Sequence, residues 1–442
     1  MTRAPRRNAE FGLIILAVLL TGALYALASL GRSASLPANI VPFLAVILVL
    51  LVGAHVGVRI LAPDSDGMLL ALAAMLNGIG YVFIARLDPG LAGLQAVWTA
   101  LGIGAFLGTL ALVRRARDLE RYRYSFAILG VALLLMPLLP VVCRNINGAR
   151  LWVRVGTITF QPGELAKIAL AIFFAAYLVE KRELLSEFRL TRGRLPDLRV
   201  VGPLLLAWGA SLVVMTAQRD LGSSLLFFAF FILMVWMATA RGAYLGIGLG
   251  LFAAGAVFAY SVFDHVQSRI TIWIDPWPQA TGQAYQIVQA AYAFGSGGFA
   301  GSGPGLGAPG TIPAVATDFI FAAVGEELGL LGTTAVIVAF ILMVAAGLRI
   351  ALRADHPFEQ LLAAGLTTII GLQTFIIIGG VTRLVPLTGL TLPFMSYGGS
   401  SLLANYVLLA LLIRVSDDTS RRAQRVAAEM AAARDQTVQR AS

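Results

Sequence analysis

Long, uninterrupted runs of apolar residues follow one another along the 442-residue chain. A helix needs about 20 consecutive apolar residues to cross a bilayer, whereas a membrane β-barrel shows alternation over segments of about ten residues. The runs are of the first kind. They predict an all-α, polytopic membrane protein with about twelve transmembrane helices, at residues 11–30, 41–62, 68–86, 92–113, 125–143, 164–179, 200–217, 221–239, 243–263, 318–348, 359–381 and 391–413.

Basic residues concentrate in four of the short polar segments, which are the N-terminal tail, 114–123, 181–199 and the tail after Arg414. Loops on the cytoplasmic side of a membrane carry an excess of Lys and Arg. Twelve helices and a cytoplasmic N-terminus place all four segments inside. The same count places the loops 144–163 and 264–317 outside, and it predicts that both termini are cytoplasmic.

The composition agrees with this pattern, because 58% of the residues are hydrophobic and only 13% are charged. Soluble domains carry about 25% charged residues. The net charge of +10 is accounted for by the basic cytoplasmic segments, so nucleic-acid binding is not expected. Cys143 is the single cysteine, which excludes an intrachain disulfide. The run 11–30 is long for a signal peptide and is expected to be a retained first helix.

Several soluble-enzyme signatures are missing from the sequence. It contains no Gly-rich turn ending in Gly-Lys-Ser/Thr, so ATP is not expected to drive the reaction. The three histidines, His55, His265 and His356, are scattered, and no HExxH motif occurs. A His/Cys metal cluster is therefore not expected.

Charged residues at membrane depth are costly unless they are paired or face water. Glu164 and Lys167 are three residues apart, so they share a helix face and can pair. Two interpretations stay open for this pair: a structural ion pair, or a charged wall of an outward-facing cavity. Arg219 and Asp220 form a polar junction between two helices, for which a structural role is favoured.

Asp318, Glu326 and Glu327 fall at the start of an expected helix, where carboxylates are favoured by the helix dipole. Asp318 by itself is therefore expected to be a helix cap. Arg383 lies in an outer turn, and a phosphate contact and a solvated loop charge are equally compatible with that position.

The polar loop 264–317 is the longest interruption of the apolar pattern, and it contains Arg269 and Asp275 between the aromatic residues Trp273 and Trp277. Residues 285–294 have apolar positions at helical spacing and are expected to form an amphipathic helix on the outer leaflet. Arginine binds phosphate oxygens in pairs, and a carboxylate can accept a proton from a sugar hydroxyl. The loop suits a lipid-linked pyrophosphate, with an enzyme, a transporter and a scaffold all open.

Six blocks of sequence, in order from residue 147 to residue 401, resemble the SEDS family (shape, elongation, division and sporulation), which includes RodA, FtsW and SpoVE. Within the family, the similarity is greatest to RodA-type members of actinobacteria. The blocks are 147–152, 160–167, 220–223, 273–298, 317–329 and 392–401. The family core has ten helices, which implies a core at 64–415, an extra N-terminal hairpin at 1–63 and a cytoplasmic tail at 416–442.

The resemblance implies a multi-pass protein of the bacterial plasma membrane with a role in cell-wall biogenesis, cell shape and division. The implied activity is a peptidoglycan glycosyltransferase that polymerises lipid II during elongation and works with a class B penicillin-binding protein transpeptidase. No cofactor is certain, and a divalent cation, Mg²⁺ or Mn²⁺, stays open. The implied substrate-binding residues are Arg150, Trp152, Glu164, Lys167, Arg269, Tyr285, Gln286, Asp318, Ser396 and Ser400.

The sequence departs from the family where catalysis is expected. The family pattern in the long loop reads DPxxDPxGxGYQ, and its second aspartate is Gln279 here. An amide cannot act as a base. The catalytic position is therefore assigned to Gln279 together with Asp275, with three alternatives. Asp275 substitutes as the base, another carboxylate such as Glu164 does so, or the protein is catalytically impaired and serves as a lipid II flippase or a transpeptidase scaffold.

Overall fold

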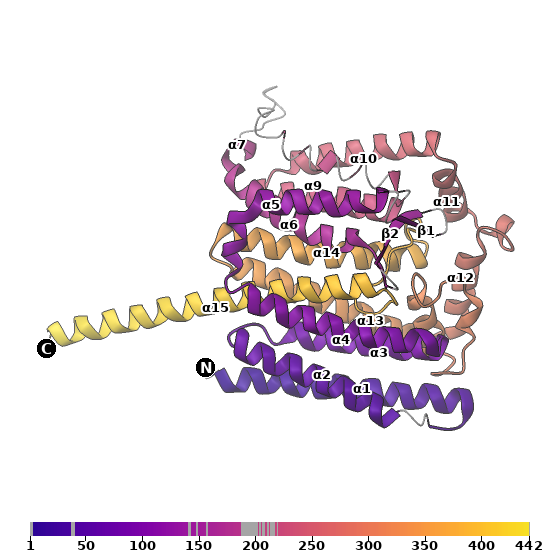
Figure 1. Cartoon of the computed structure of the whole chain (residues 1–442), viewed down its shortest axis with the longest axis horizontal. Helices are drawn as coiled ribbons and strands as arrows, with labels where there is room; N and C mark the ends of the chain where they lie inside the picture. The colour runs from indigo at the N-terminus through magenta and orange to yellow at the C-terminus, as the bar shows by residue number, and fades with distance from the viewer. Residues whose placement is uncertain are drawn as a thin grey trace.

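A computed structural model of the chain describes residues 3–36, 40–139, 143–146, 149–155, 158–186 and 220–441, with single positions between 202 and 218. Long helices lie side by side in one bundle (Figure 1). The polar loop 264–317 lies at one end of the bundle, which we call the loop side. Both chain ends lie at the opposite end, which we call the tail side.

Eleven segments of the described residues are long and apolar enough to cross a membrane, which confirms the polytopic helical class. Their helices are α1 (Arg3–Ser33), α2 (Ile40–Leu61), α3 (Met68–Leu87), α4 (Pro89–Leu112), α5 (Arg123–Leu135), α6 (Pro162–Glu180), α9 (Leu221–Thr239), α10 (Gly242–Val262), α13 (Ile320–Arg353), α14 (Pro357–Val381) and α15 (Gly399–Ala441). The remaining predicted span, 200–217, lies mostly outside the described residues.

Two predicted spans begin or end differently in the structure. The span expected at 125–143 is wrong at its end, since α5 stops at Leu135 and Pro137 follows in the short helix η2 (Met136–Leu138). The span expected from 391 begins only at Gly399, after Pro393 and a Phe394 with a φ of 63°. Pro137 and Pro393 lie close to these two boundaries, although Met136, the residue before Pro137, keeps helical geometry with a φ of −52° and a ψ of −43°.

The helices α1 and α2 form a hairpin at one edge of the bundle, next to α3 and α4 (Figure 1). Within the hairpin, Nδ1 of His55 lies 3.0 Å from Oε1 of Glu10, and both side chains are buried. Gly78 of α3 allows the close approach of α1, because an added Cβ would overlap with the hydroxyl of Thr21.

The loop side carries the only non-helical elements of the described chain. A three-stranded antiparallel sheet consists of β1 (Cys143–Ile146), β2 (Ala149–Val155) and β3 (Ile158–Phe160). The register pairs Arg144 with Trp152 and Val153 with Phe160. The alternation of apolar and polar residues in these strands is too short to be recognised in the sequence. The sheet was therefore not predicted, and it is a small addition to an otherwise α-helical fold. The loop 264–317 contributes α11 (Asp264–Ile274), η4 (Trp277–Gln279), α12 (Tyr285–Gly297) and η5 (Pro309–Thr311).

The predicted helix at 285–294 is present as α12, and it packs against the first turns of α13. α13 kinks at Gly329, where φ is 62° and ψ is −159°. The kink exposes carbonyl groups, and the segment after α12 satisfies them: the Ser302 amide donates to the Glu326 carbonyl at 2.9 Å, and the Gly303 amide donates to the Glu327 carbonyl at 3.1 Å. The loop is therefore fixed by backbone hydrogen bonds at a helix kink.

The packing of α12 predicts a large difference between two glycines of one helix. A Cβ added at Gly297 would overlap with the carbonyl oxygen of Gly325, whereas a Cβ at Gly295 meets nothing within 4 Å. We expect Gly297→Ala to lower the free energy of unfolding by about 1–3 kcal/mol because of overpacking. Gly295→Ala is the control and should be neutral or stabilising by up to about 1 kcal/mol. Thermal unfolding in detergent measures both, and equal stabilities would contradict this packing.

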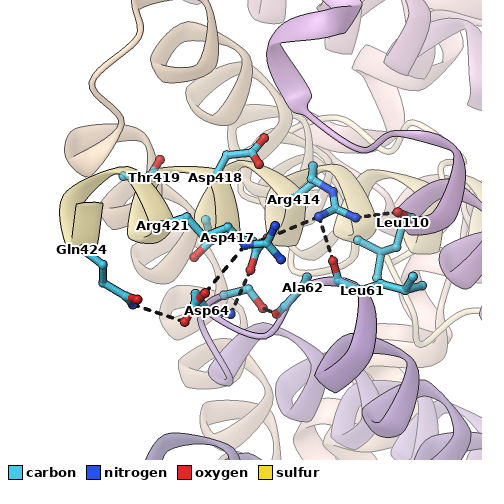
Figure 2. Close-up of polar contacts among 12 residues, drawn as sticks. Leu61, Ala62, Asp64, Leu110, Arg414, Asp417, Asp418, Thr419, Arg421 and Gln424 are labelled. Carbon is cyan, nitrogen blue, oxygen red and sulfur yellow. Dashed lines mark hydrogen bonds and ion pairs between the residues drawn. The ribbon is translucent and has the colours of Figure 1, made fainter. Parts of the chain in front are cut away.

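At the tail side, charged residues of α15 bind the ends of neighbouring helices (Figure 2). Arg414 donates to the carbonyls of Leu61 and Leu110, while Asp417 accepts a 2.8 Å hydrogen bond from the Asp64 amide. Arg421 lies 2.9 Å from Asp417. Helix α15 continues through the tail predicted from residue 416, and Asp417 at its start is fully buried.

Candidate active site

A buried ion pair stands at the loop-side start of α6. Nζ of Lys167 lies 2.8 Å from Oε2 of Glu164, which confirms the pairing predicted from their spacing. Lys167 also donates to Oε1 of Gln373 on α14 at 2.8 Å, and Gln373 donates through Nε2 to the Thr391 carbonyl at 2.8 Å. Glu164 and Lys167 offset each other's charge, which is what charged groups inside a membrane require. The chain of contacts fixes α6, α14 and the loop before α15 to one another.

A second charged group, formed by Asp220, Arg269 and Asp318, lies next to this pair. Asp220 caps α9, because its Oδ1 accepts a 3.0 Å hydrogen bond from the Ser223 amide. Burial raises the pKa of Asp220, while Arg269 acts in the opposite direction. Burial lowers the pKa of Arg269, and the negative charges of Asp220 and Asp318 oppose that shift. The guanidinium of Arg269 is thus the shared positive neighbour of two carboxylates.

Asp318 is the titratable group of this cluster that is best suited to proton transfer. Burial raises its pKa to about 6, against the opposing effects of the Thr317 hydroxyl and of Arg269. Its side chain is only half-buried by surface area, as is that of Arg269. At neutral pH Asp318 is mostly ionised and close to its pKa, which is the condition for an effective general base.

The expectation that Asp318 caps α13 is wrong. Phe319 occupies the cap position, and its side chain makes no cap hydrogen bond. Glu326 and Glu327 lie inside the helix, where they accept hydrogen bonds from the amides of Ala308 at 2.7 Å and Gly305 at 2.9 Å. Arg86 of α3 pairs with Glu327. These two glutamates therefore anchor the loop 298–308, whereas Asp318 neither caps α13 nor takes part in this anchoring in the contacts described.

The connection between α14 and α15 covers the cluster. Arg269 donates to the Leu387 carbonyl at 2.8 Å. Gly389 has a φ of 76°, and a Cβ at that position would lie 3.5 Å from Oδ2 of Asp318. A glycine here combines a left-handed backbone with an open approach to the carboxylate. The charged groups are consequently held between α6, α9, α11 and this connection.

The predicted catalytic positions lie on the surface of the loop. Asp275 is exposed, and its Oδ1 accepts a 3.2 Å hydrogen bond from the Trp277 amide, as in a local turn. Gln279 is half-buried, and its carbonyl accepts from the amides of Gly282 and Ala284. Among the contacts of the described residues, none brings Asp275 or Gln279 to Arg269 and Asp318. A catalytic role for them stays a prediction.

Arg383 makes backbone contacts that neither of the two expectations from the sequence included, and a phosphate contact stays a prediction. Its Nη2 donates to the carbonyls of Trp273 at 3.1 Å and Ile274 at 3.2 Å, and its own carbonyl accepts a 3.0 Å hydrogen bond from Nε1 of Trp273. Arg383 therefore clamps the end of α11, the helix that carries Arg269, to the connection after α14.

Several predicted substrate-binding residues have structural contacts. Ser400 accepts a 2.8 Å hydrogen bond from the Gln161 amide at the start of α6, and Ser396 accepts one of 2.9 Å from the Leu392 amide. Gln286 donates to the Pro313 carbonyl at 3.4 Å. Tyr285 at the start of α12 and Trp152 in β2 are both half-buried.

Some predicted residues fall outside what can be described. Arg150 belongs to β2, but its side chain lies outside the described part of the chain, as do Asn147, Gly148 and Arg219 entirely. Gln373 and the position of Asp220 beside Arg269 were missed, whereas the structural role favoured for Asp220 agrees with its cap of α9. The available signal for Gln373 was an amide deep inside the apolar run 359–381, which is costly there without a partner.

A divalent cation at the cluster stays a prediction, because one or two carboxylates together with substrate phosphates are enough to hold Mg²⁺. Within the described ranges, no three His, Cys, Asp or Glu side chains are grouped so that they could hold a metal ion. Asp220 and Asp318 have the guanidinium of Arg269 as their positive neighbour. The arrangement places Asp318, a carboxylate with a pKa of about 6, beside Arg269, a cation suited to binding phosphate oxygens.

Comparisons with known proteins agree with this setting. Residues 86–421 match the FTSW_RODA_SPOVE family, described as "Cell cycle protein". The chain is 44% identical to the peptidoglycan glycosyltransferase RodA of Mycobacterium tuberculosis over 94% of this chain and 92% of that protein. It is 37% identical to the probable peptidoglycan glycosyltransferase FtsW of Geobacter metallireducens, covering 71% of this chain and 83% of that protein.

Two solved structures are similar in fold. The first is a chain from a study of polymerization and crosslinking by a peptidoglycan synthase complex, with a TM-score of 0.67, 28% identity, and coverage of 80% of this chain and 98% of that chain. The second is the Thermus thermophilus rod shape determining protein RodA, with a TM-score of 0.59, 27% identity, and coverage of 80% and 97%. Both similarities extend over most of the bundle.

Proposed function

The chain belongs to the FtsW/RodA/SpoVE family of cell cycle proteins, and we propose that it is a peptidoglycan glycosyltransferase that polymerises lipid II for cell-wall elongation. The observation that carries the proposal is the loop-side cluster, in which Asp318, with a pKa of about 6, adjoins Arg269. A base beside a phosphate-binding cation is what the transfer of a sugar from a lipid pyrophosphate requires.

The proposed reaction joins two sugars with loss of a lipid pyrophosphate. The 4-hydroxyl oxygen of the acceptor attacks the anomeric carbon of the donor, and Asp318 accepts the hydroxyl proton. The bond between that carbon and the pyrophosphate oxygen breaks, and undecaprenyl pyrophosphate leaves with the electron pair. Arg269 is half-buried, so one face of its guanidinium can bind the departing phosphate oxygens.

The proposed orientation places the tail side in the cytoplasm. The segment 114–123 with five arginines and both chain ends lie there, in agreement with the positive-inside rule. The cluster then faces the outside, where cell wall is made. A class B penicillin-binding protein is the proposed partner, supported by the similarity to a chain from a peptidoglycan synthase complex.

Polymerisation of labelled lipid II by the purified full-length protein tests the activity, with and without the transpeptidase partner. Glycan chains are expected in at least one of the two conditions. If neither produces chains but lipid II crosses liposome membranes, the protein is a flippase instead. If chains form, the variant Gln279→Asp shows the effect of restoring the family aspartate. A higher rate in this variant would mean that the natural glutamine at position 279 limits the activity of the native protein.

The titration of Asp318 predicts how the rate depends on pH. A protonated carboxyl group cannot accept the hydroxyl proton, so activity is present above the pKa and lost below it. With a pKa of about 6, kcat/KM should be halved near that pH and should fall about tenfold per unit below it. A pH series of initial rates measures this. Asp275→Asn should leave the profile unchanged, and a profile that is flat from pH 7 to pH 5 would contradict the role of Asp318.

A further inference from the structure

A basic cavity of about 1020 Å³ opens on the tail side, between the connection of α4 to α5 and the part of α15 that leaves the bundle. The connection contains the short helix η1 (Ala116–Tyr122). Eight arginines and three acidic residues line the cavity, an excess of five positive charges: Arg114, Arg115, Arg117, Arg121, Arg123, Arg421, Arg422, Arg425, Asp118, Glu120 and Asp418. The mechanism proposed above uses none of them.

Three of these arginines already have carboxylate partners. Arg123 pairs with Glu180 at the end of α6. Arg421 lies 2.9 Å from Asp417, and Arg422 binds the buried Glu359 of α14 through both terminal nitrogens. The other five, Arg114, Arg115, Arg117, Arg121 and Arg425, make no ion pair within 4 Å among the described residues.

The walls of the cavity are held in place. Oδ2 of Asp418 accepts a 2.7 Å hydrogen bond from the Ala116 amide, which fixes η1 against α15. The Arg422–Glu359 pair ties α15 to α14, and the network in Figure 2 ties it to α2, to α4 and to Asp64 in the connection between α2 and α3. Five arginines that form no ion pair with the described residues are thus kept on a fixed framework. Like charges held near one another repel, which raises the free energy of the empty cavity. Because the walls are fixed and cannot move apart, a bound anion would lower that repulsion.

The level of the cavity relative to the membrane identifies the source of the anion. The membrane-spanning helix α4 ends at Leu112, whose side chain is 85% exposed, and α5 begins at Arg123. Tyr122, just before α5, and Tyr124, in its first turn, are exposed, and tyrosines are typical of the membrane–water interface. The cavity therefore lies at the depth of the lipid headgroups, where phosphate diesters are the abundant anions.

We propose that this cavity binds the phosphate headgroup of an anionic phospholipid from the leaflet on the tail side. Basic pockets between membrane helices bind such headgroups, and arginine suits phosphate oxygens. A volume of about 1020 Å³ accommodates a headgroup with two phosphates. The inference goes beyond the proposed function, because it assigns a lipid site on the side opposite to the reacting sugars.

Lipid retention by the full-length protein tests the proposal. The protein is purified in detergent, incubated with phosphatidylglycerol or with phosphatidylcholine of the same acyl chains, and examined by native mass spectrometry over a lipid concentration series. The double variant R117Q/R121Q removes two of the five arginines without a described ion pair from one wall. The double variant R349Q/R353Q is the control, because it removes two exposed arginines at the tail-side end of α13, outside the cavity.

Each arginine close to an anionic lipid strengthens binding about fivefold, so R117Q/R121Q should bind phosphatidylglycerol about thirtyfold more weakly. R114Q/R425Q, which draws on both walls, should reproduce the loss with unchanged helical content by circular dichroism. R349Q/R353Q should bind like the native protein, and phosphatidylcholine should bind weakly to all four proteins.

Three outcomes would overturn the proposal. The first is an equal loss in R349Q/R353Q, which would mean nonspecific attraction to a basic surface. The second is that soluble inorganic pyrophosphate displaces phosphatidylglycerol at equal concentration, which would mean a site for a soluble anion. The third is that a glutamate-rich peptide binds the native protein and not R117Q/R121Q while phosphatidylglycerol binds both alike, which would mean a protein-docking site. Lipid retention is measured without polymerisation, so its failure is distinct from failure of the proposed enzyme activity.

Discussion

Asp318→Asn is expected to reduce the rate of lipid II polymerisation by about 10²–10⁴-fold, the usual contribution of a general base. The asparagine amide has the shape of the carboxylate but cannot accept the acceptor proton. Burial raises the pKa of Asp318 to about 6, so its ionised form is disfavoured at this position. Replacing it with a neutral amide adds no buried charge, and we therefore expect no loss of stability from this cause. Initial rates with labelled lipid II measure the effect.

Asp275→Asn is the matched control for this experiment. Asp275 undergoes the same chemical change on the same side of the molecule, but it is exposed and its described contact is the Trp277 amide. We expect its rate to stay within a few fold of the native rate, as for a surface substitution. The opposite result, with Asp275→Asn inactive and Asp318→Asn active, would return the base to the position that the sequence alone suggests.

Lys167→Met is expected to cause the largest loss of stability, about 3–5 kcal/mol, because it leaves the carboxylate of Glu164 buried without its cation. Both side chains are almost fully buried, and Lys167 also supplies the hydrogen bond to Gln373. Unfolding in detergent by heat or denaturant measures the change.

The double variant Lys167→Met with Glu164→Gln separates a charge effect from a packing effect. Removing both charges takes away the isolated carboxylate, so most of the lost stability should return. If the double variant is as unstable as Lys167→Met, the loss arises from the altered packing of α6. If Lys167→Met itself unfolds like the native protein, the Glu164–Lys167 pair does not stabilise the bundle.

The transmembrane helices were predictable from the sequence because hydrophobic run length is a local property. The Glu164–Lys167 pair was predictable for the same reason, since the two residues are neighbours on one helix face. Helix ends were less so: α5 ends near Pro137, within an apolar run that continues past it. The sheet β1–β3 was missed because its strands are three to seven residues long.

The cluster itself depends on contacts between segments far apart in the chain. Asp220, Arg269 and Asp318 belong to three different segments, and nothing in their local sequence shows that they meet. Arg383 could not be assigned either, because its partners lie 109 and 110 residues away. Gln279 was identified only through the family pattern. The sequence therefore provides a set of candidate site residues, and the tertiary contacts show which of these residues lie together.

Helix α15 has a mechanical consequence for the whole molecule. It runs for 43 residues without a break, so it is about 65 Å long. Near one end, Ser400 holds the Gln161 amide at the start of the helix that carries Glu164 and Lys167. Further along, Asp417 and Arg421 engage residues on the opposite side of the membrane. A single continuous helix thus connects the tail side to the loop side. A displacement of the tail-side end of α15 along the helix axis would be transmitted to the start of α6 on the loop side.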